Sequence, residues 1–167
     1  MIETKQLIIK PLDFSQLLKY VKNDNSLELE LCVGISNRII SLELKEALEQ
    51  AILPFVAKNE TNYLFFTLWT IILKSENRMV GDLCFRGIPD VNGSIEIGYG
   101  TYEGYRGKGF MTEAVGGMIA WAKTHPAVKS VIAETDKTNV ASMMILQKNG
   151  FVKSDESIDF FQWKLQL

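Results

Sequence analysis

Residues 104–114 constrain the fold of this chain more than any other segment. Their sequence is Gly-Tyr-Arg-Gly-Lys-Gly-Phe-Met-Thr-Glu-Ala, and they join a strand-like run at 94–99 to a run of helical spacing at 110–123. Glycine lets a backbone turn its amide groups outward and approach a ligand closely. A helix that begins at such a turn offers unpaired N–H groups and a positive dipole end, which together bind phosphate. The segment therefore predicts a turn between strand and helix that binds a phosphorylated cofactor.

The spacing excludes two common phosphate loops. A Walker A loop requires Ser or Thr after Gly-Lys, whereas Gly107-Lys108 is followed by Gly109. A dinucleotide-binding loop requires a third glycine where this chain has Thr112. The pattern that remains is Arg-x-x-Gly-x-Met, from residue 106 to residue 111.

This pattern resembles the pyrophosphate loop of the GNAT superfamily of acyl-CoA-dependent N-acyltransferases, which reads Arg/Gln-x-x-Gly-x-Gly/Ala. Arg106 and Gly109 match it, and Met111 departs from the final small residue. The family uses that last position mainly through its backbone amide, so the resemblance implies that the loop still works. An ordinary glycine-rich turn is the alternative.

Further segments are similar to the branch that includes ribosomal-protein N-terminal acetyltransferases (RimJ/RimL-like). Residues 112–114, Thr-Glu-Ala, and residues 4–12 resemble that branch's third helix and first strand. Asn139-x-x-Ser142 and residues 148–151, Lys-Asn-Gly-Phe, resemble its fourth helix and the turn that follows. The resemblance therefore extends over most of the chain.

The predicted fold is α/β with a mixed, mostly antiparallel sheet, helices on both faces and one parallel βαβ crossover, which is the GNAT-like acyl-CoA N-acyltransferase fold. The crossover consists of a strand at 94–99, a helix at 110–123 and a strand at 129–135. Ligands of such sheets bind beyond the carboxyl ends of parallel strands, where the glycine-rich turn lies. The other predicted elements are strands at 6–12, 62–73 and 79–86, helices at 14–22, 41–58 (disturbed at Pro54) and 139–148, and a hairpin of 151–153 with 158–166.

Composition indicates one globular domain over residues 1–167, because 47% of the residues are hydrophobic and 23% are charged. A net charge of −2 argues against broad nucleic-acid binding. The longest apolar stretch, 63–73, is too short to cross a bilayer, and no secretion signal is visible, so we expect a cytoplasmic protein without a membrane partner. Cys32, Cys84 and one histidine form no zinc pattern, so we expect no metal and two buried or partly buried thiols.

The resemblance implies acetyl-CoA as cosubstrate. Arg106 and Lys108 would add positive charge around its phosphates, although they could also be plain solvated cations. Glycines on either side of Tyr99 favour a β-bulge that pairs with the pantetheine arm and aims an N–H at the thioester oxygen. The residues expected to bind the cofactor are Gly98, Tyr99, Arg106, Gly107, Lys108, Gly109, Phe110, Met111, Thr112 and Asn139.

Glu96 is the candidate catalytic base, because some members of the family use a glutamate at the matching strand position to deprotonate the amine. A solvated carboxylate is the alternative. An ordinary glutamate pKa of about 4.3 is closer to that of an α-amine, about 7.7–8.0, than to that of a lysine amine, about 10.4. This comparison favours an α-amine as the acceptor.

Ser142 is the candidate donor to the departing thiolate. Many GNAT enzymes place a tyrosine in the fourth helix, and Leu146 occupies that position here. In the RimJ/RimL-like branch, the serine three residues after the helix-opening asparagine approaches the CoA sulfur. Ser142 could also be a packing residue, and Asn139 could be only a helix N-cap.

These residues predict an N-acetyltransferase in which a primary amine, such as a protein N-terminal α-amine, attacks the thioester directly through a tetrahedral intermediate. The alternatives are an acetyltransferase for a small amine (a polyamine, an amino acid or an aminoglycoside) and a non-catalytic acyl-CoA sensor. We expect residues 23–41 and the final hairpin to form the acceptor pocket. Asp24, Glu28 and Glu30 would either recruit a cation there or form a solvated face. Many members of the family form dimers, so the resemblance is compatible with a homodimer.

Overall fold

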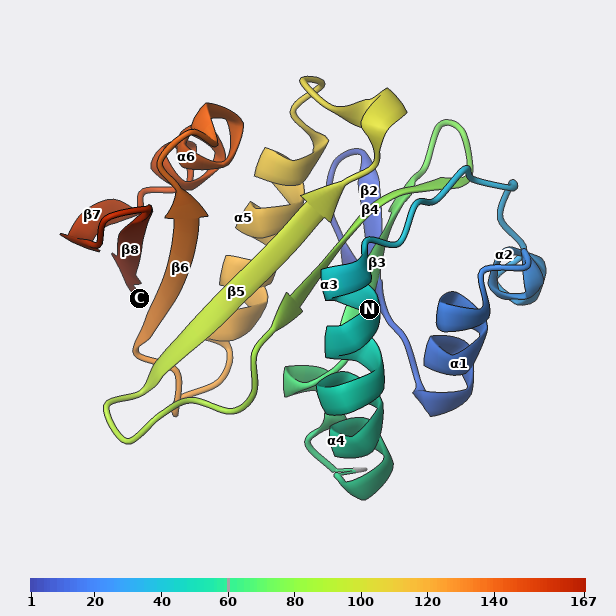
Figure 1. Cartoon of the computed structure of the whole chain (residues 1–167), viewed down its shortest axis with the longest axis horizontal. Coiled ribbons are helices and arrows are strands. Elements are labelled where there is room, and N and C mark those ends of the chain that lie inside the picture. The colour runs from blue at the N-terminus through green and yellow to red at the C-terminus, as the bar shows by residue number, and fades with distance from the viewer. Residues whose placement is uncertain (60) are drawn as a thin grey trace.

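An eight-stranded mixed sheet organises the protein (Figure 1), which is a computed structural model describing residues 1–59 and 61–167. The strand order is β1-β2-β3-β4-β5-β6-β8-β7, and only the β5–β6 pair is parallel. The predicted mixed sheet with one parallel crossover is therefore confirmed. The strands are β1 (Ile2–Glu3), β2 (Leu7–Pro11), β3 (Leu68–Leu73), β4 (Arg78–Phe85), β5 (Ser94–Thr101), β6 (Ser130–Asp136), β7 (Val152–Glu156) and β8 (Phe160–Gln166).

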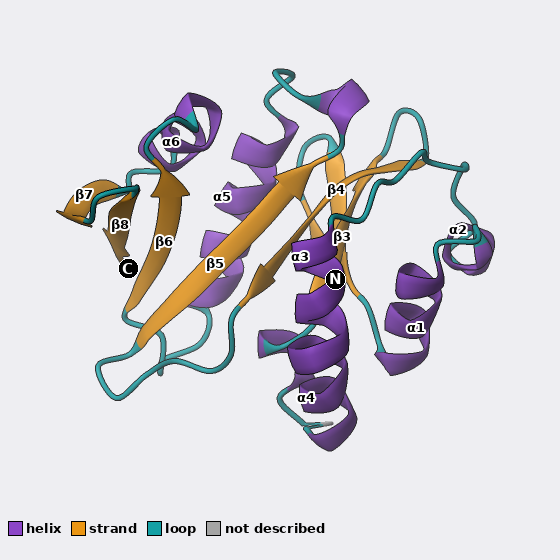
Figure 2. Ribbon diagram, viewed as in Figure 1, coloured by secondary structure: helices purple, strands orange, loops and turns teal. Residues whose placement is uncertain are grey.

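Helices cover both faces of this sheet (Figure 2). The long helix α5 (Phe110–Lys123) packs on one face, and α6 (Val140–Lys148), which follows β6, contacts it. The opposite face carries the shorter helices, which share a second apolar cluster. These are α1 (Phe14–Lys22), α2 (Ser26–Glu30), α3 (Leu42–Ala47) and α4 (Leu53–Lys58).

Strand β3 connects the two apolar clusters because all six of its residues are buried. Trp69 and Ile71 belong to the cluster under α5, whereas Leu68 and Ile72 belong to the cluster under the short helices. Side chains of a strand alternate between the two faces, so a run of large apolar residues fits a strand that is covered on both sides. This explains why the stretch is apolar on both alternating faces, with Thr70 as the one polar residue of β3.

The helix predicted at 41–58 forms with a disturbance close to the predicted one. Ser41 caps it, because its side chain accepts a hydrogen bond from the Leu44 N–H. A wide π-helical segment, Leu48–Ile52, separates α3 from α4, whose first turn contains Pro54. Proline has no N–H to donate to the preceding turn, so the regular pattern of hydrogen bonds is interrupted there.

Two local predictions are wrong. The strand expected to begin at residue 62 begins at Leu68, because Tyr63–Phe65 forms a 3₁₀ turn. The weakly patterned segment after residue 23 contains the short helix α2, which the sequence did not indicate. Among the described residues, no helix is both long enough and apolar enough to cross a membrane.

Glu113, in the first turn of α5, ties this helix to the N-terminal hairpin. Its carboxylate accepts hydrogen bonds from the Thr4 hydroxyl at 2.6 Å, the Gln6 N–H at 2.7 Å and the Gln6 side-chain amide at 2.8 Å. Partial burial acts to raise the pKa of Glu113, but these hydrogen bonds outweigh it and lower the pKa below its usual value. The ionised carboxylate therefore stabilises the folded state.

We expect Glu113→Gln to lower the free energy of unfolding at pH 7 by about 1 kcal/mol. Because the folded-state pKa is lowered, this contribution is complete above the unfolded value of about 4.3 and is lost as the pH falls below it. Urea unfolding at pH 7 and at low pH measures both effects. The exposed Glu46→Gln variant is the control; an equal loss there, or a loss independent of pH, would contradict the assignment.

Candidate active site

The site begins where β5 and β6 separate. They pair over three positions, from Ser94 with Ser130 to Glu96 with Ile132. Beyond these, residues 97–101 pair only with β4. Figure 1 shows the two ribbons side by side at their origin and diverging toward their carboxyl ends.

The divergence leaves one edge of β5 without a ladder partner. The Arg86 N–H on the β4 side donates to the Glu96 carbonyl at 2.9 Å, and hydrogen-bonding positions of an antiparallel ladder alternate. The backbone N–H and carbonyl groups of Gly98 and Gly100 therefore point toward β4. Those of Tyr99, between them, point toward the opening. The predicted bulge around Tyr99 is wrong, because the β4–β5 register runs without a shift. The opening results from the departure of β6 and not from an extra residue.

The glycine-rich turn opens the start of α5. Gly107 and Gly109 have φ angles of 73° and 83°, which favour glycine, and a Cβ at either position would meet no atom within 4 Å. Gly109 is the helix N-cap, and no side chain caps the helix. Among the described residues, none accepts a hydrogen bond from the backbone N–H groups of residues 107–112. The turn is thus an exposed group of amide donors at the positive end of a helix.

The side chains around this turn divide into two kinds. Arg106 and Lys108 are exposed, with the Lys108 ammonium 5.1 Å from the centre of the Tyr105 ring. Met111 is 4% exposed and packs in the core under α5. Its side chain therefore points away from the turn, which explains how a large residue fits where related loops have a small one.

Tyr99 and Ser142 are brought together at the opening. Their hydroxyl oxygens lie 2.8 Å apart, and the Tyr99 hydroxyl also donates to the Ser142 carbonyl at 3.3 Å. Asn139 caps α6, since its side-chain oxygen accepts from the Ser142 N–H at 3.1 Å. Burial raises the pKa of Tyr99, against a smaller opposing effect of the Ser142 hydrogen bond, so this hydroxyl stays protonated at neutral pH. Leu146 is fully buried.

Glu96 forms an ion pair. One of its carboxylate oxygens lies 2.8 Å from the Arg86 guanidinium, which is itself largely exposed. Glu96 is therefore neither a free base nor an isolated solvated carboxylate, and its role in catalysis stays a prediction.

A large pocket lies on the face of the sheet that carries the short helices. Its wall near α3 and α4 is apolar, its floor is the carboxyl half of β5 with β4, and it extends to the glycine-rich turn. Of the segments expected to form the acceptor pocket, 23–41 contributes five residues to this cavity, and no described residue of the final hairpin lines it. The five residues are Ile35, Ser36, Asn37, Ile39 and Ser41. The apolar wall consists of Ile35, Ile39, Leu44, Ile52 and Phe55.

Two glycines leave the floor of this pocket bare. A Cβ at Gly98 would lie 3.8 Å from the Cys84 sulfur, and a Cβ at Gly100 would meet no atom within 4 Å. Neither residue has a positive φ angle, so the backbone does not require glycine at these positions. The missing side chains create space beside Asp82, the register partner of Gly100.

Asp82 is a buried carboxylate on this floor that the sequence analysis did not identify. One oxygen, Oδ2, accepts hydrogen bonds from the Tyr20 hydroxyl at 2.6 Å and the Tyr102 hydroxyl at 2.8 Å. Burial raises the pKa of Asp82 to about 6, although these hydrogen bonds and the charge of Arg38 oppose the increase. The feature of the sequence that could have indicated Asp82 is the presence of an aspartate in a mostly apolar strand, because buried carboxylates are rare.

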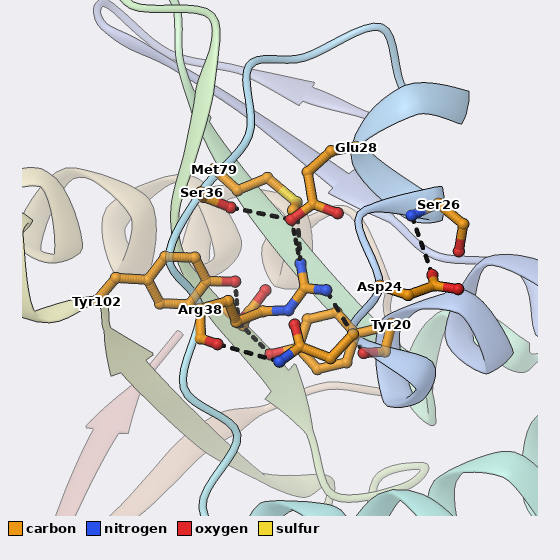
Figure 3. Close-up of polar contacts among 10 residues, drawn as sticks. Tyr20, Asp24, Ser26, Glu28, Ser36, Arg38, Met79 and Tyr102 are labelled. Atoms are coloured by element: carbon orange, nitrogen blue, oxygen red, sulfur yellow. Dashed lines mark hydrogen bonds and ion pairs between the residues drawn. The ribbon is translucent and has the colours of Figure 1, made fainter.

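Behind Asp82, Arg38 and Glu28 form a buried ion pair with a nitrogen–oxygen distance of 3.0 Å (Figure 3). Ser36 donates to the same Glu28 oxygen, and the Arg38 guanidinium lies 4.3 Å from the centre of the Tyr20 ring. The predicted solvated face is therefore wrong for Glu28. Asp24 and Glu30, which form surface ion pairs with Lys22 and Lys19, do not line the pocket.

The two cysteines differ in environment. Cys32 is exposed, contrary to the prediction, whereas burial raises the pKa of Cys84 to about 11. Cys84 lines the pocket, but its thiol stays protonated at neutral pH and is a poor nucleophile. Among residues 1–59 and 61–167, no group of three or more His, Cys, Asp or Glu could hold a metal ion.

Comparisons with known proteins show that this fold and site belong to the acetyltransferase class, and they also identify the family. The chain belongs to the GNAT family, whose model, described as an acetyltransferase (GNAT) domain, matches residues 10–152. It is also similar to the uncharacterized N-acetyltransferase YjdG of Bacillus subtilis (strain 168), with 30% identity over 163 residues that cover 98% of this chain and 96% of the relative.

Two solved structures share the fold over nearly the full length. One is RimL, a ribosomal L7/L12 alpha-N-protein acetyltransferase in complex with coenzyme A, with a TM-score of 0.68, 17% identity, and coverage of 98% of this chain and 96% of the other. The other is a dodecameric spermidine N-acetyltransferase from Vibrio cholerae, with a TM-score of 0.69, 14% identity and coverage of 98% and 95%. The GNAT superfamily is confirmed, but proteins with different acceptors match equally well, so the comparisons do not select the RimJ/RimL-like branch.

We expect iodoacetamide at pH 8 to modify Cys32 and to leave Cys84 largely unmodified, because the thiolate is the reactive form and burial suppresses it at Cys84. Mass spectrometry of the intact protein and its peptides measures the two sites. A Cys32→Ser variant is the control and should take up almost no label. Equal labelling of both cysteines in the folded protein would contradict the burial of Cys84.

Proposed function

We propose that this protein is an acetyl-CoA-dependent N-acetyltransferase that acts as one domain over residues 1–167 and transfers the acetyl group to a primary amine. The observation that carries the proposal is that the backbone N–H groups of residues 107–112, next to the open edge of β5, have no acceptor in the part of the chain that the structure describes. A diphosphate fits such a turn because each amide donates and the helix dipole is favourable. The homodimer and the cytoplasmic location stay predictions.

The residues present fit coenzyme A as a substrate. The amides of residues 107–112 would hold its diphosphate, with Arg106 and Lys108 adding positive charge. The open edge at Tyr99 offers backbone groups to the pantetheine arm. The bound molecule supplies an acetyl group activated as a thioester.

The remaining chemistry falls to groups of this chain. The Tyr99 N–H is available to stabilise the developing oxyanion of the tetrahedral intermediate. The paired hydroxyls of Ser142 and Tyr99 can donate a hydrogen bond to the leaving sulfur. They would take the role of the tyrosine that many GNAT enzymes have at the position of Leu146. Neither cysteine is placed as a nucleophile, which supports direct attack by the amine.

A protein N-terminal α-amine remains the preferred acceptor on grounds of basicity, because at neutral pH it is already partly deprotonated. Small amines are the alternative. Only the protonated part of an α-amine population needs a base, and Glu96 is the candidate that the sequence indicates for this step, directly or through water.

Gly109→Glu should weaken coenzyme A binding about a hundredfold or more, because it places a negative side chain where the diphosphate belongs. The matched control is Gly109→Asn, since asparagine tolerates a positive φ angle and adds no charge. Isothermal titration calorimetry measures both affinities, and thermal melting checks the fold. Unchanged affinity in Gly109→Glu would remove the proposed cofactor site.

Ser142→Ala should lower kcat by about tenfold to a hundredfold while acetyl-CoA affinity stays within about threefold, because a hydrogen bond to a forming thiolate contributes about 1.5–3 kcal/mol. A Glu96→Gln, Ser142→Ala double variant should be slower still and should retain binding. Thiol release during turnover measures the rate. Wild-type turnover in the double variant would refute both catalytic assignments.

A further inference from the structure

Asp82 keeps one carboxylate oxygen free in the interior. Its Oδ1 is buried and has no hydrogen-bond partner among the described residues, whereas Oδ2 has two. The Thr70 hydroxyl, on the neighbouring strand β3, lowers the pKa of Asp82 as a nearby donor, but it forms no hydrogen bond of normal geometry with Oδ1. A buried oxygen of a carboxylate without a partner is costly in a folded protein and indicates a group that binds something else.

We propose that Asp82 binds the acceptor amine and takes its proton, with Oδ1 accepting the N–H. This inference rests on the proposed function. Asp82 is 5% exposed and lies on the pocket floor, where the bare backbone of Gly100 leaves space beside it. Tyr99, whose N–H faces the opening between the strands, is the next residue to Gly100. The site for the amine and the site for the thioester are thus adjacent on β5.

The surroundings of Asp82 suit this role better than those of Glu96. Glu96 already has Arg86 at 2.8 Å. Oδ2 of Asp82 is held by two tyrosine hydroxyls, which fixes the direction of Oδ1. The titratable and charged groups that face Asp82 are Tyr20 from α1, Tyr102 after β5, Arg38 from the segment before α3, and Cys84 from β4.

Burial makes Asp82 more basic than an ordinary aspartate, whereas the tyrosine hydroxyls and Arg38 lower its pKa enough to leave it ionised at neutral pH. Burial raises the pKa of Tyr20 and of Tyr102, so both remain donors, and Cys84 remains a neutral thiol. Arg38 is the one cation among them, and it lowers the pKa of Asp82. With a pKa of about 6, the carboxylate is within about two units of an α-amine.

The proton balance is simple. The ammonium form of the acceptor gives one proton to Asp82, and the neutral nitrogen forms the N–C bond as the C=O π bond opens to the oxyanion of the tetrahedral intermediate. When the C=O bond re-forms, the C–S bond breaks, and the nitrogen's second proton passes to the sulfur, which leaves as a thiol with help from the Ser142 hydroxyl. Asp82 then releases its proton to solvent, so each turnover yields one proton from an ammonium acceptor.

The pocket also defines the class of amine. Three large apolar side chains on its wall are well exposed: Ile35 at 56%, Ile39 at 80% and Phe55 at 49%. Such a wall favours a ligand with an apolar body. We therefore assign the acceptor as a primary monoamine whose skeleton next to the nitrogen is apolar, supplied either by a peptide N-terminus or by a small arylalkylamine.

A polyamine fits this pocket less well. Asp82 is the only buried carboxylate that lines it among the described residues, and the other acidic lining residues are exposed to water. Four cationic side chains line the same pocket and would repel a second ammonium group. These cations are Arg78, Arg86, Arg106 and Lys108.

The test uses the full chain with acetyl-CoA and three acceptors: a peptide beginning with an apolar residue, phenethylamine and spermidine. Thiol release gives kcat and KM for each acceptor from pH 5 to pH 9, and calorimetry gives coenzyme A affinity. We expect the wild type to prefer the peptide or phenethylamine over spermidine by about tenfold or more in kcat/KM. A preference for spermidine would overturn the assigned class.

Asp82→Asn preserves the shape of the side chain and removes its charge. We expect kcat/KM for the amine to fall roughly 30-fold or more, coenzyme A affinity to stay within about twofold, and the acidic limb of the pH profile near pH 6 to disappear. Glu43→Gln, which removes an exposed carboxylate that lines the same pocket, is the matched control and should retain that limb. A retained limb in Asp82→Asn, or kcat/KM within threefold of the wild type, would overturn the assignment.

Gly100→Ala gives an independent test should Asp82→Asn fold poorly. Its Cβ meets no atom of the protein, so we expect an unchanged melting temperature and unchanged coenzyme A affinity, together with a KM for the amine raised about tenfold or more. Unchanged KM for all three amines would contradict an acceptor beside Gly100. If the wild type neither bound coenzyme A nor acetylated any of the three amines, the proposed function itself would be refuted.

Discussion

The short parallel pairing of β5 with β6 is the constraint on which the rest of the structure depends. Three residue pairs hold the strands together, and their separation exposes one edge of β5 inside the protein rather than at the rim of the sheet. Exposed edges of strands are normally covered or paired, so an interior one indicates a place for an extended ligand. The same separation places the N-terminus of α5, the hydroxyls of Tyr99 and Ser142, and the pocket floor at one end of the molecule.

The second organising element is the buried polar cluster around Arg38. A buried charge is tolerated only when it is paired and hydrogen-bonded, and Arg38 has Glu28 on one side and the Tyr20 ring on the other. This arrangement fixes the segment between α2 and α3, which supplies part of the apolar wall of the pocket. It also orients Tyr20 toward Asp82. The side chains that stabilise this segment are therefore also the ones that orient the proposed acceptor site.

The site residues illustrate which roles a linear sequence can reveal. Gly107 and Gly109 were identifiable because an amide-donating turn requires glycine at particular φ angles, which is a local property. Ser142 became a candidate through the resemblance, which gives a role to the serine three residues after Asn139, but its partner Tyr99 is 43 residues away and only the folded chain joins them. Asp82 could not be assigned a role, because one aspartate in an apolar strand looks the same whether it is solvated at an edge or buried beside two tyrosines.

The sequence by itself determined the alternation of strands and helices, the crossover that makes β5 and β6 parallel, and the glycine-rich turn before α5, because periodicity, capping and glycine conformation act over a few residues. It did not determine where β6 leaves β5, that Tyr63–Phe65 turns before β3, or that Glu28 is buried. Those features depend on contacts between segments distant in the chain. Whether a carboxylate faces water, an arginine or an open pocket is decided by what packs against it, and packing is a property of the tertiary structure alone.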